Sequence, residues 1–511
     1  MTTALSSILG SQLSYTGGVL NAKTRRQYGA AQGFLPIGFR GFGAPGGGFF
    51  DSTNNSVADL SFFQAPSFCG VTAIKLIYAG FDFSDHGPVD RAVSATGYAS
   101  VLTTTAVFSV YCLGGVGSGV TVIPLTIGQG VATDVSAGQT IGGTNIPAGT
   151  TIVSVNPTYV TNGTMTAISV TISAATIGVI AAAANLTVGG QIYPAKWGQQ
   201  RQFNIVPQHD VIVSDAIPIT VAAGAWFGVK TSVTFSGTGF LTVSQPGAAS
   251  GTQRLTQGGL IETSQRGTSL ADQTLLAAAP ASNTGGGAWC PLTVLGALTT
   301  PAAAILVLGD SIAWGTGDLV DTNGRMGYIH RSFGNAIPWV SMPRGSTSAV
   351  QMIHNTRGAY RLAVETGVTD LLLEYCRNDL IAGITAASVI TSLQTIAGPF
   401  IAAGIRVWVF TCPPTTTSTD AWATSANQTI ANISAETQRI AYNAALRSGG
   451  AVALGFAGLI DMSAVVEDGA NPGKWLTTSG AWTTDGVHPN STQGHPALIA
   501  AAIVAPTNFV L

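Results

Sequence analysis

A serine stands at the end of a short apolar run, where either a nucleophile or a helix cap would be placed. Residues 304–308 read Ala-Ile-Leu-Val-Leu, and Gly309-Asp310-Ser311 follows at once. A continuous apolar run of this length that ends at a glycine predicts a buried strand of a parallel sheet. Ser311 then lies at the carboxyl end of that strand, where open α/β sheets bind their ligands. The alternative interpretation is that Asp310 and Ser311 only cap the following helix.

Three further blocks stand at comparable places, each just past a predicted strand or in a C-terminal loop. They are Gly345, the pair Asn378-Asp379, and residues 485–490, which read Asp-Gly-Val-His-Pro-Asn. With Gly309-Asp310-Ser311 they resemble, in the same order, the four blocks of the SGNH (GDSL) hydrolase family. The resemblance covers residues 302–511. One block alone has little specificity, but four in this order favour a nucleophile at Ser311 over a helix cap.

The resemblance implies a serine esterase. It assigns Ser311 as the nucleophile, His488 as the base that takes its proton, and Asp485 as the carboxylate that orients the histidine. It assigns the binding of the oxyanion to the backbone N–H groups of Ser311 and Gly345 and to the side chain of Asn378. Neither a cofactor nor a metal is expected, because the other histidines have no clustered carboxylates.

One position departs from the family pattern. The third block of the family usually reads Gly-x-Asn-Asp, whereas this chain has Cys376-Arg377-Asn378-Asp379. A side chain at position 376 is expected to shift the loop or narrow the pocket, which bears on the geometry of Asn378 and on activity. The alternative that Cys376 is itself the nucleophile is disfavoured, because no histidine is near it in the sequence and the serine block is intact.

Three residues beside these blocks are candidates for substrate binding. Arg344 and Arg377 each adjoin a predicted oxyanion donor and could grip an acidic substrate, such as a uronate or a sulfated sugar. The alternative is that they pair with carboxylates such as Glu374 or Asp379. Trp314 follows the nucleophile closely, and it either packs in the core or forms a platform for a sugar.

The C-terminal part alternates strands and helices. Strands are expected at residues 304–308, 337–342, 369–375, 406–411 and 455–461, and helices at 348–365, 386–403, 434–447 and 492–504. Such alternation predicts a parallel sheet with helices on both faces. Residues 298–511 are therefore expected to form a three-layer α/β/α, flavodoxin-like hydrolase domain.

The residues before this domain are expected to be all-β. A glycine-rich arm, residues 1–55, precedes a β-sandwich accessory domain made of residues 56–118 and 196–297. Residues 119–195, with Asp134 as their one charged residue, are interpreted as an inserted all-β module; the alternative is a surface hairpin of the sandwich. Residues 213–217 with Ala223-Gly224 resemble the β-domain of some GDSL-type esterases. Residues 139–155 and 168–173 resemble a small β-module of bacteriophage structural proteins.

The composition narrows the class of protein. Charged residues make up 9% of the 511 residues, the net charge is −2 and the mean hydropathy is +0.37, whereas average soluble proteins have about 25% charged residues. The chain has no excess of basic residues that would indicate nucleic-acid binding. It also lacks an uninterrupted apolar run of about 18 residues, the length that would span a membrane. The five scattered cysteines predict single buried thiols rather than disulfides or a zinc site.

The expected activity is the removal of O-acetyl or similar acyl groups from a polysaccharide. The weak charge predicts that other subunits cover part of the surface, in a homo-oligomer, a phage tail or another particle. Residues 1–6 lack the features of a signal peptide, so the protein is expected to be cytoplasmic before release and then extracellular or virion-associated. The alternatives are a lipase or arylesterase that acts on small or lipid esters, and an inactive receptor-binding structural protein. The sugar and the acyl group are left open.

Overall fold

The fold is known from a computed structural model. It describes residues 34–37, 46–49, 56–79, 94–103, 108–127, 135, 137–161, 164–205, 211–236, 240–243, 263–268, 270–275, 280 and 290–509. Most of the predicted N-terminal arm, including residues 1–33, lies outside these ranges. Within them, no helix is both long enough and apolar enough to cross a membrane.

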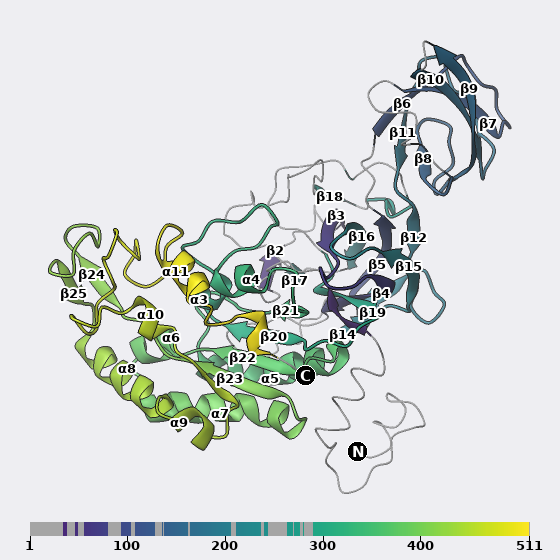
Figure 1. Cartoon of the computed structure of the whole chain (residues 1–511). Helices are drawn as coiled ribbons and strands as arrows, with labels where there is room; N and C mark the ends of the chain where they lie inside the picture. Colours follow the sequence, from purple (N-terminus) through teal and green to yellow (C-terminus); the bar gives the residue numbers. More distant parts are fainter. Residues whose placement is uncertain are drawn as a thin grey trace, which may run out of the picture.

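A five-stranded parallel sheet forms the centre of the C-terminal part (Figure 1). Its strands, from edge to edge, are β21 (Trp339–Ser341), β20 (Ile305–Gly309), β22 (Asp370–Glu374), β23 (Arg406–Phe410) and β26 (Gly458–Ile460). In chain order this is the arrangement 2-1-3-4-5, which is the flavodoxin-like order. The predicted parallel sheet is therefore confirmed. Strand β20 has the predicted length but begins one residue later, and the other four strands are shorter than the pattern indicated.

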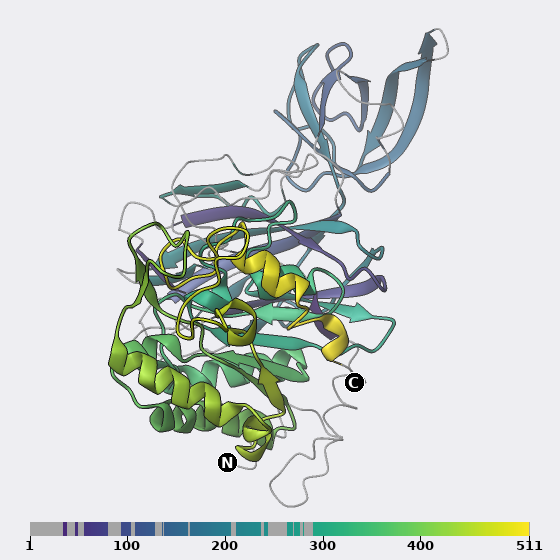
Figure 2. The same cartoon turned by 60° about the vertical axis from the view of Figure 1, so that its left-hand side comes forward.

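Helices cover both faces of this sheet (Figure 2). On one face, alternate strand residues such as Leu306 and Leu371 pack with α5 (Ala349–Thr366), α6 (Arg377–Ile381), α7 (Ala386–Ala402), α8 (Ile433–Leu446) and α9 (Gly450–Ala453). On the other, Ile305 and Leu372 pack with α3 (Ser311–Trp314), α4 (Tyr328–Phe333), α10 (Ser463–Val466) and α11 (Gly494–Ala500). Both faces are buried, which explains why the strands read as continuous apolar runs.

Local signals fix the helix ends where they are strong. Helix α5 begins with a capping box between Ser348 and Gln351 and ends at Gly367, whose φ of 65° suits glycine. The predicted terminal helix at 492–504 is shorter in the structure, at Gly494–Ala500. It is followed by η2 (Pro506–Asn508). A small antiparallel pair, β24 (Thr416–Ser418) and β25 (Gln428–Ile430), lies before α8.

Two antiparallel sheets precede the parallel one. The first contains β1 (Phe34–Ile37), β19 (Thr293–Leu298), β4 (Val71–Ala79), β14 (Val211–Val213) and β15 (Ile217–Val221). The second contains β12 (Ile192–Pro194), β5 (Ser94–Thr103), β16 (Trp226–Ser236), β3 (Ser56–Gln64), β18 (Thr263–Gly267) and β13 (Phe203–Ile205). Side chains from both sheets share one core, which includes Ile74, Tyr78, Val101 and Phe227. A short pair, β2 (Gly46–Phe49) with β17 (Phe240–Val243), completes this region.

A six-stranded antiparallel sheet with its own core stands apart from the other sheets (Figure 1). It contains β8 (Thr140–Gly142), β11 (Asn185–Gly189), β6 (Phe108–Cys112), β7 (Val122–Ile127), β10 (Thr164–Ile172) and β9 (Ile152–Thr161). The sequence placed residues 108–112 in the accessory domain, but β6 pairs with β7 and β11. Composition missed this because β6, like the strands before and after it, consists of apolar and small polar residues without charge. The predicted domain limits as such stay a prediction.

Candidate active site

The turn between β20 and α3 presents Ser311 at the carboxyl edge of the sheet. Asp310 is the N-cap of α3, and its Oδ1 accepts a hydrogen bond from the Ile312 N–H at 2.8 Å. A side chain at position 309 would collide with the Ala313 side chain of α3 and approach the Glu374 carbonyl oxygen of β22 to 2.9 Å, so only glycine fits there. Strand pairing and a helix cap therefore hold Ser311 in place. The capping interpretation is right for Asp310, and it leaves the Ser311 hydroxyl free for another partner.

That partner is His488. Ser311 Oγ and His488 Nε2 lie 2.8 Å apart, although 177 residues separate them in the sequence. The other ring nitrogen, Nδ1, lies 2.6 Å from Asp485 Oδ2. The structure therefore joins serine, imidazole and carboxylate in one line of hydrogen bonds. This is the arrangement in which a histidine can take a serine proton while a carboxylate orients the ring.

The loop between Asp485 and His488 fixes the carboxylate. Asp485 Oδ1 accepts hydrogen bonds from the N–H groups of Val487 and His488, at 2.8 and 2.9 Å. Partial burial alone would raise the pKa of Asp485, but the hydrogen bonds from His488 and the backbone hold that pKa well below its usual value. Gly486 has a φ of 76°, and its carbonyl oxygen accepts from Trp475 Nε1 at 3.0 Å. Asp485 is thus ionised near neutral pH, and hydrogen bonds hold its loop in place.

Two backbone donors stand beside the serine. An ideal Cβ on Gly345 would lie 3.9 Å from Ser311 Cβ and 3.3 Å from the Trp314 ring, which places Gly345 next to the nucleophilic position. The Arg344 N–H donates to the Gly309 carbonyl oxygen at 2.9 Å and ties this loop to β20. Within the described chain, the N–H groups of Ser311 and Gly345 donate to no other residue. Both are therefore available to an oxyanion.

Asn378 is close to the site but its amide is occupied. Asn378 Nδ2 donates to the Thr347 carbonyl oxygen at 2.9 Å and to Asp310 Oδ2 at 3.3 Å. An oxyanion would have to take over one of these hydrogens, and the longer bond to Asp310 is the weaker one. The sequence identified Asn378 as a donor but could not foresee this competition.

Cys376 is buried at the start of α6, and its effect on the loop and on activity stays a prediction. Its φ of −176° is extended backbone that any residue adopts, and its side chain is buried in the core that includes residues of α7 and α8. Burial raises the pKa of this thiol well above its usual value, and Cys412 beside it adds to the effect. Cys376 is therefore a neutral core thiol, and nucleophilic reactivity would need the thiolate.

The two candidate arginines make no ion pair within the described residues. Glu374 and Asp379, their suggested partners, are engaged elsewhere, because Asp379 accepts from the N–H groups at the start of α5. Arg377 Nη1 reaches only Asn378 Oδ1, at 3.4 Å. Arg344 Nη1 and Arg377 Nε are buried atoms with no hydrogen-bond partner. The pairing alternative is thus wrong for both arginines.

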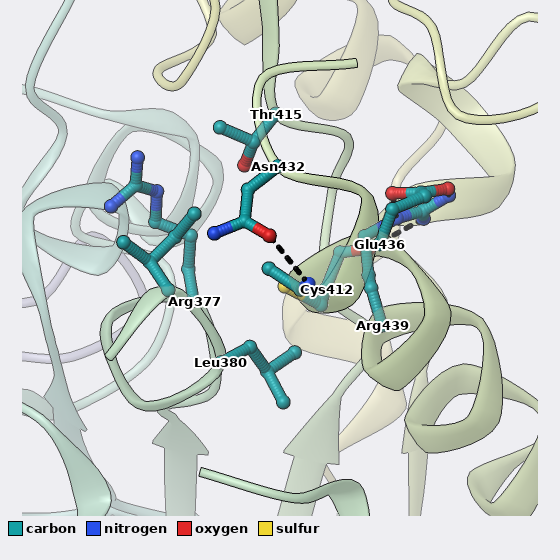
Figure 3. A pocket seen from close by; sticks show the side chains of 9 residues that line it. Arg377, Leu380, Cys412, Thr415, Asn432, Glu436 and Arg439 are labelled. Carbon is teal, nitrogen blue, oxygen red and sulfur yellow. Dashed lines mark hydrogen bonds and ion pairs between the residues drawn. The ribbon is translucent and has the colours of Figure 1, made fainter. Parts of the chain in front are cut away.

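A small hollow opens beside Arg377 (Figure 3). It lies between α6 and the start of α8. Figure 3 shows Arg377 on one side and Arg439 on the other. Arg439 is neutralised by Glu436 and Glu467, at 2.7 and 2.6 Å. Of the two arginines that line the hollow, Arg377 is therefore the one without an ion pair among the described residues.

The remaining histidines play other parts. His495 is buried between Tyr328 and Thr316, and burial lowers its pKa to about 4. His330 is buried as well, while His354 is exposed. His86 and His209 lie outside the described residues. Among the described residues, no group of three or more His, Cys, Asp or Glu side chains could hold a metal ion.

Glu374, at the end of β22, is a residue whose place in the site the sequence analysis missed. It is fully buried, and its carbonyl oxygen accepts a hydrogen bond from the N–H of Asp310, also fully buried, at 3.3 Å. Burial raises the pKa of Asp310 to about 6, while burial and the Asp310 carboxylate raise the pKa of Glu374 well above its usual value. The available signal was a glutamate that ends an otherwise apolar strand, level with Gly309 in the register.

Comparisons with known proteins give a likeness in structure alone. No protein-family model matches the chain, and no curated protein matches it. Similar solved structures include a GDSL-like lipase from Bacteroides thetaiotaomicron, with 16% identity over 39% of this chain and 85% of that one (TM-score 0.28). A second is a lipolytic G-D-S-L family member from Veillonella parvula, with 17% identity over 40% of this chain and 97% of that one (TM-score 0.28). A third is a mutant acetyl-xylooligosaccharide esterase from Geobacillus, with 12% identity over 39% of this chain and 91% of that one (TM-score 0.27). At such identities and TM-scores, the chemistry has to be argued from the site itself.

Proposed function

We propose that this chain is a serine ester hydrolase of the SGNH (GDSL) type. The observation that carries the proposal is the line of two hydrogen bonds from Ser311 Oγ through His488 to Asp485, at 2.8 and 2.6 Å. Ser311 is the nucleophile, His488 the general base and Asp485 the group that orients the ring and stabilises the imidazolium.

The reaction proceeds through an acyl-enzyme. His488 Nε2 takes the hydroxyl proton while Ser311 Oγ attacks the ester carbonyl carbon, and the π electrons move onto the carbonyl oxygen. When that oxyanion collapses, the alcohol leaves with the proton from His488, and the acyl group stays on Ser311. A water molecule then gives a proton to His488 and attacks the acyl carbon. When this second oxyanion collapses, the bond from the acyl carbon to Ser311 Oγ breaks, the acid leaves, and the serine takes the proton back from His488.

The oxyanion is stabilised by the N–H groups of Ser311 and Gly345, with the Asn378 amide as the third donor. The first two have no competing acceptor in the described chain. Asn378 gives up its 3.3 Å bond to Asp310 as the negative charge develops. Because the amide bonds more strongly to the oxyanion than to a carbonyl oxygen, this exchange favours the transition state over the bound ester.

The proposed substrate is an O-acetylated, acidic polysaccharide. Arg344 and Arg377 flank the oxyanion donors without ion pairs, so their charge is available to a carboxylate or sulfate of the sugar. The half-buried Trp314 ring lies against Gly345, one of the proposed oxyanion donors, and this bulk beside the donor supports the proposal of a small acyl group. The low charge of the chain and its separate β-module support the further proposal of a phage tail or another extracellular particle.

The activity is tested first with a fluorophosphonate probe, which labels only an activated serine. Labelling at Ser311 in the folded protein supports the proposal, and no labelling contradicts it. Acetate release from a panel of acetylated polysaccharides is then compared with the hydrolysis of nitrophenyl esters of increasing acyl length. A preference for long acyl chains would support the lipase alternative instead.

The two arginines are tested by substitution. Arg344→Gln and Arg377→Gln are each expected to raise KM for an acidic acetylated polysaccharide by about tenfold or more, the loss of one charged hydrogen bond. Hydrolysis of neutral nitrophenyl acetate should change much less. Arg447→Gln, which removes an arginine paired with Asp461, is the matched control. Equal losses on charged and neutral substrates would contradict the assignment.

A further inference from the structure

Two buried carboxyl groups meet directly beneath the serine. Asp310 and Glu374 are both fully buried, and the Asp310 N–H donates to the Glu374 carbonyl oxygen at 3.3 Å. Each carboxyl group is close enough to shift the pKa of the other. Gly309 and Glu374 are register partners in the parallel sheet, which brings the ends of β20 and β22 together. Glu374 Oε2 also accepts from the Ala313 N–H at 3.2 Å, inside α3. The pair therefore touches the strand, the turn and the helix that carry Ser311.

One proton must be shared between these groups. Two carboxylates in contact in a buried site cannot both carry a charge. Asp310 has two N–H donors, from Ile312 at 2.8 Å and from Asn378 at 3.3 Å. Glu374 has one, from Ala313, and its Oε1 is buried and accepts from no donor in the described chain. The negative charge therefore resides on Asp310, and Glu374 holds the proton.

We propose that Glu374 is a positioning residue of this hydrolase: its neutral carboxyl group donates a hydrogen bond to Asp310 and so holds the Asp310 carboxylate where it caps α3 and orients Asn378. The proposal rests on the ester hydrolysis proposed above. Asp310 links the nucleophile to the third oxyanion donor, because its two oxygens accept from Ile312 and Asn378 separately. Without a donor from Glu374, the same carboxylate would lack its side-chain partner at the base of the site.

Few other charged groups of the described residues lie near Asp310 and Glu374. The phenols and thiols that face it are Tyr328, Tyr375, Tyr442, Cys376 and Cys412. Burial raises the pKa of each of the three phenols and of Cys376 well above its usual value, so these groups stay neutral near neutral pH. The charged groups are Arg377 and, once it takes the serine proton, His488. The Asp310 carboxylate thus faces the imidazolium that forms during the reaction and stabilises it.

Infrared spectroscopy of the whole protein tests the proton directly. At neutral pH we expect the C=O stretching band of a buried, protonated carboxylic acid, and we expect Glu374→Gln to abolish it. Glu365→Gln, which changes an exposed glutamate on α5, is the matched control and should leave the band in place. If the wild-type protein has no such band, or if Glu374→Gln retains it, the proposal is overturned.

Kinetics test the positioning role. Glu374→Gln keeps a donor for Asp310, whereas Glu374→Leu removes it. We expect kcat of the leucine variant to be about ten- to a hundredfold lower than that of the glutamine variant, the range for one hydrogen bond to a charged group, with similar KM. The acid limb of its kcat profile should also move to higher pH, because the Asp310 carboxylate has lost a stabilising donor.

The outcomes separate the two proposals. Equal kcat values and pH profiles for the folded leucine and glutamine variants would overturn the positioning role. If the leucine variant does not fold, the infrared band still decides who holds the proton. A wild-type protein that shows the band but hydrolyses no ester would contradict the proposed function, and the proton would still be on Glu374.

Discussion

Replacing Asn378 by alanine removes the donor that has to change partners during the reaction. One missing oxyanion donor lowers kcat by roughly 10²–10³, or about 2.7–4 kcal/mol of transition-state stabilisation. Because the amide contacts the ester oxygen mainly once charge develops, KM should change little. The free energy of unfolding should also fall, because the Thr347 carbonyl oxygen and Asp310 Oδ2 both lose a hydrogen bond. A loss of about 1–3 kcal/mol is expected for leaving such buried acceptors unsatisfied.

The assay for Asn378→Ala is steady-state hydrolysis of nitrophenyl acetate together with thermal unfolding. Asn443→Ala is the matched control, since Asn443 is a buried asparagine that bonds both backbone groups of Cys412, at 2.7 and 2.9 Å, and hydrogen-bonds to none of the proposed catalytic residues. The control should lose stability to a similar degree but keep kcat. If folded Asn378→Ala keeps kcat within about threefold of the wild type, Asn378 is no oxyanion donor and only holds the Thr347 loop.

Three more predictions concern the serine, the carboxylate and a buried histidine. Ser311→Ala should abolish hydrolysis and fluorophosphonate labelling while changing the free energy of unfolding by less than about 1 kcal/mol, since it removes one half-buried hydroxyl; unchanged turnover would refute the mechanism. Asp485→Asn should lower kcat by up to about 10⁴-fold through loss of the correct histidine tautomer, and a residual rate should remain because the oxyanion donors survive; a wild-type rate would exclude Asp485 from the mechanism. Burial lowers the pKa of His330 to about 4, from 6.5, so the unfolded chain takes up its proton first and stability should fall as the pH drops from about 6.5 to about 4. His330→Gln should reduce that slope by about 1.4 kcal/mol per pH unit in urea unfolding at a series of pH values, and an unchanged slope would contradict the assignment.

Much of the C-terminal fold follows from local patterns in the sequence. The apolar runs that end at Gly309 and Glu374 are strands because both of their faces are buried, and a sequence without alternation records this directly. Helix α5 was predictable because its cap and its stop are encoded by Ser348, Gln351 and Gly367. The N-terminal region was harder to divide. Strand β6 has the composition of its neighbours, and only its pairing with β7 and β11 shows to which sheet it belongs.

For the candidate site, too, some features follow from the sequence and others only from the tertiary structure. The sequence by itself determined the residue types and their order: a serine after a strand, a glycine, an asparagine, and an aspartate three residues before a histidine. Only the tertiary structure decided their partners, because contacts across 177 residues depend on which strands are neighbours. In the tertiary structure Asp379 accepts a hydrogen bond from the N–H of Ala349, and Arg344 and Arg377 are left without ion pairs within the described residues. It also placed Glu374 against Asp310, since parallel register aligns the ends of β22 and β20, a relation that no local spacing encodes.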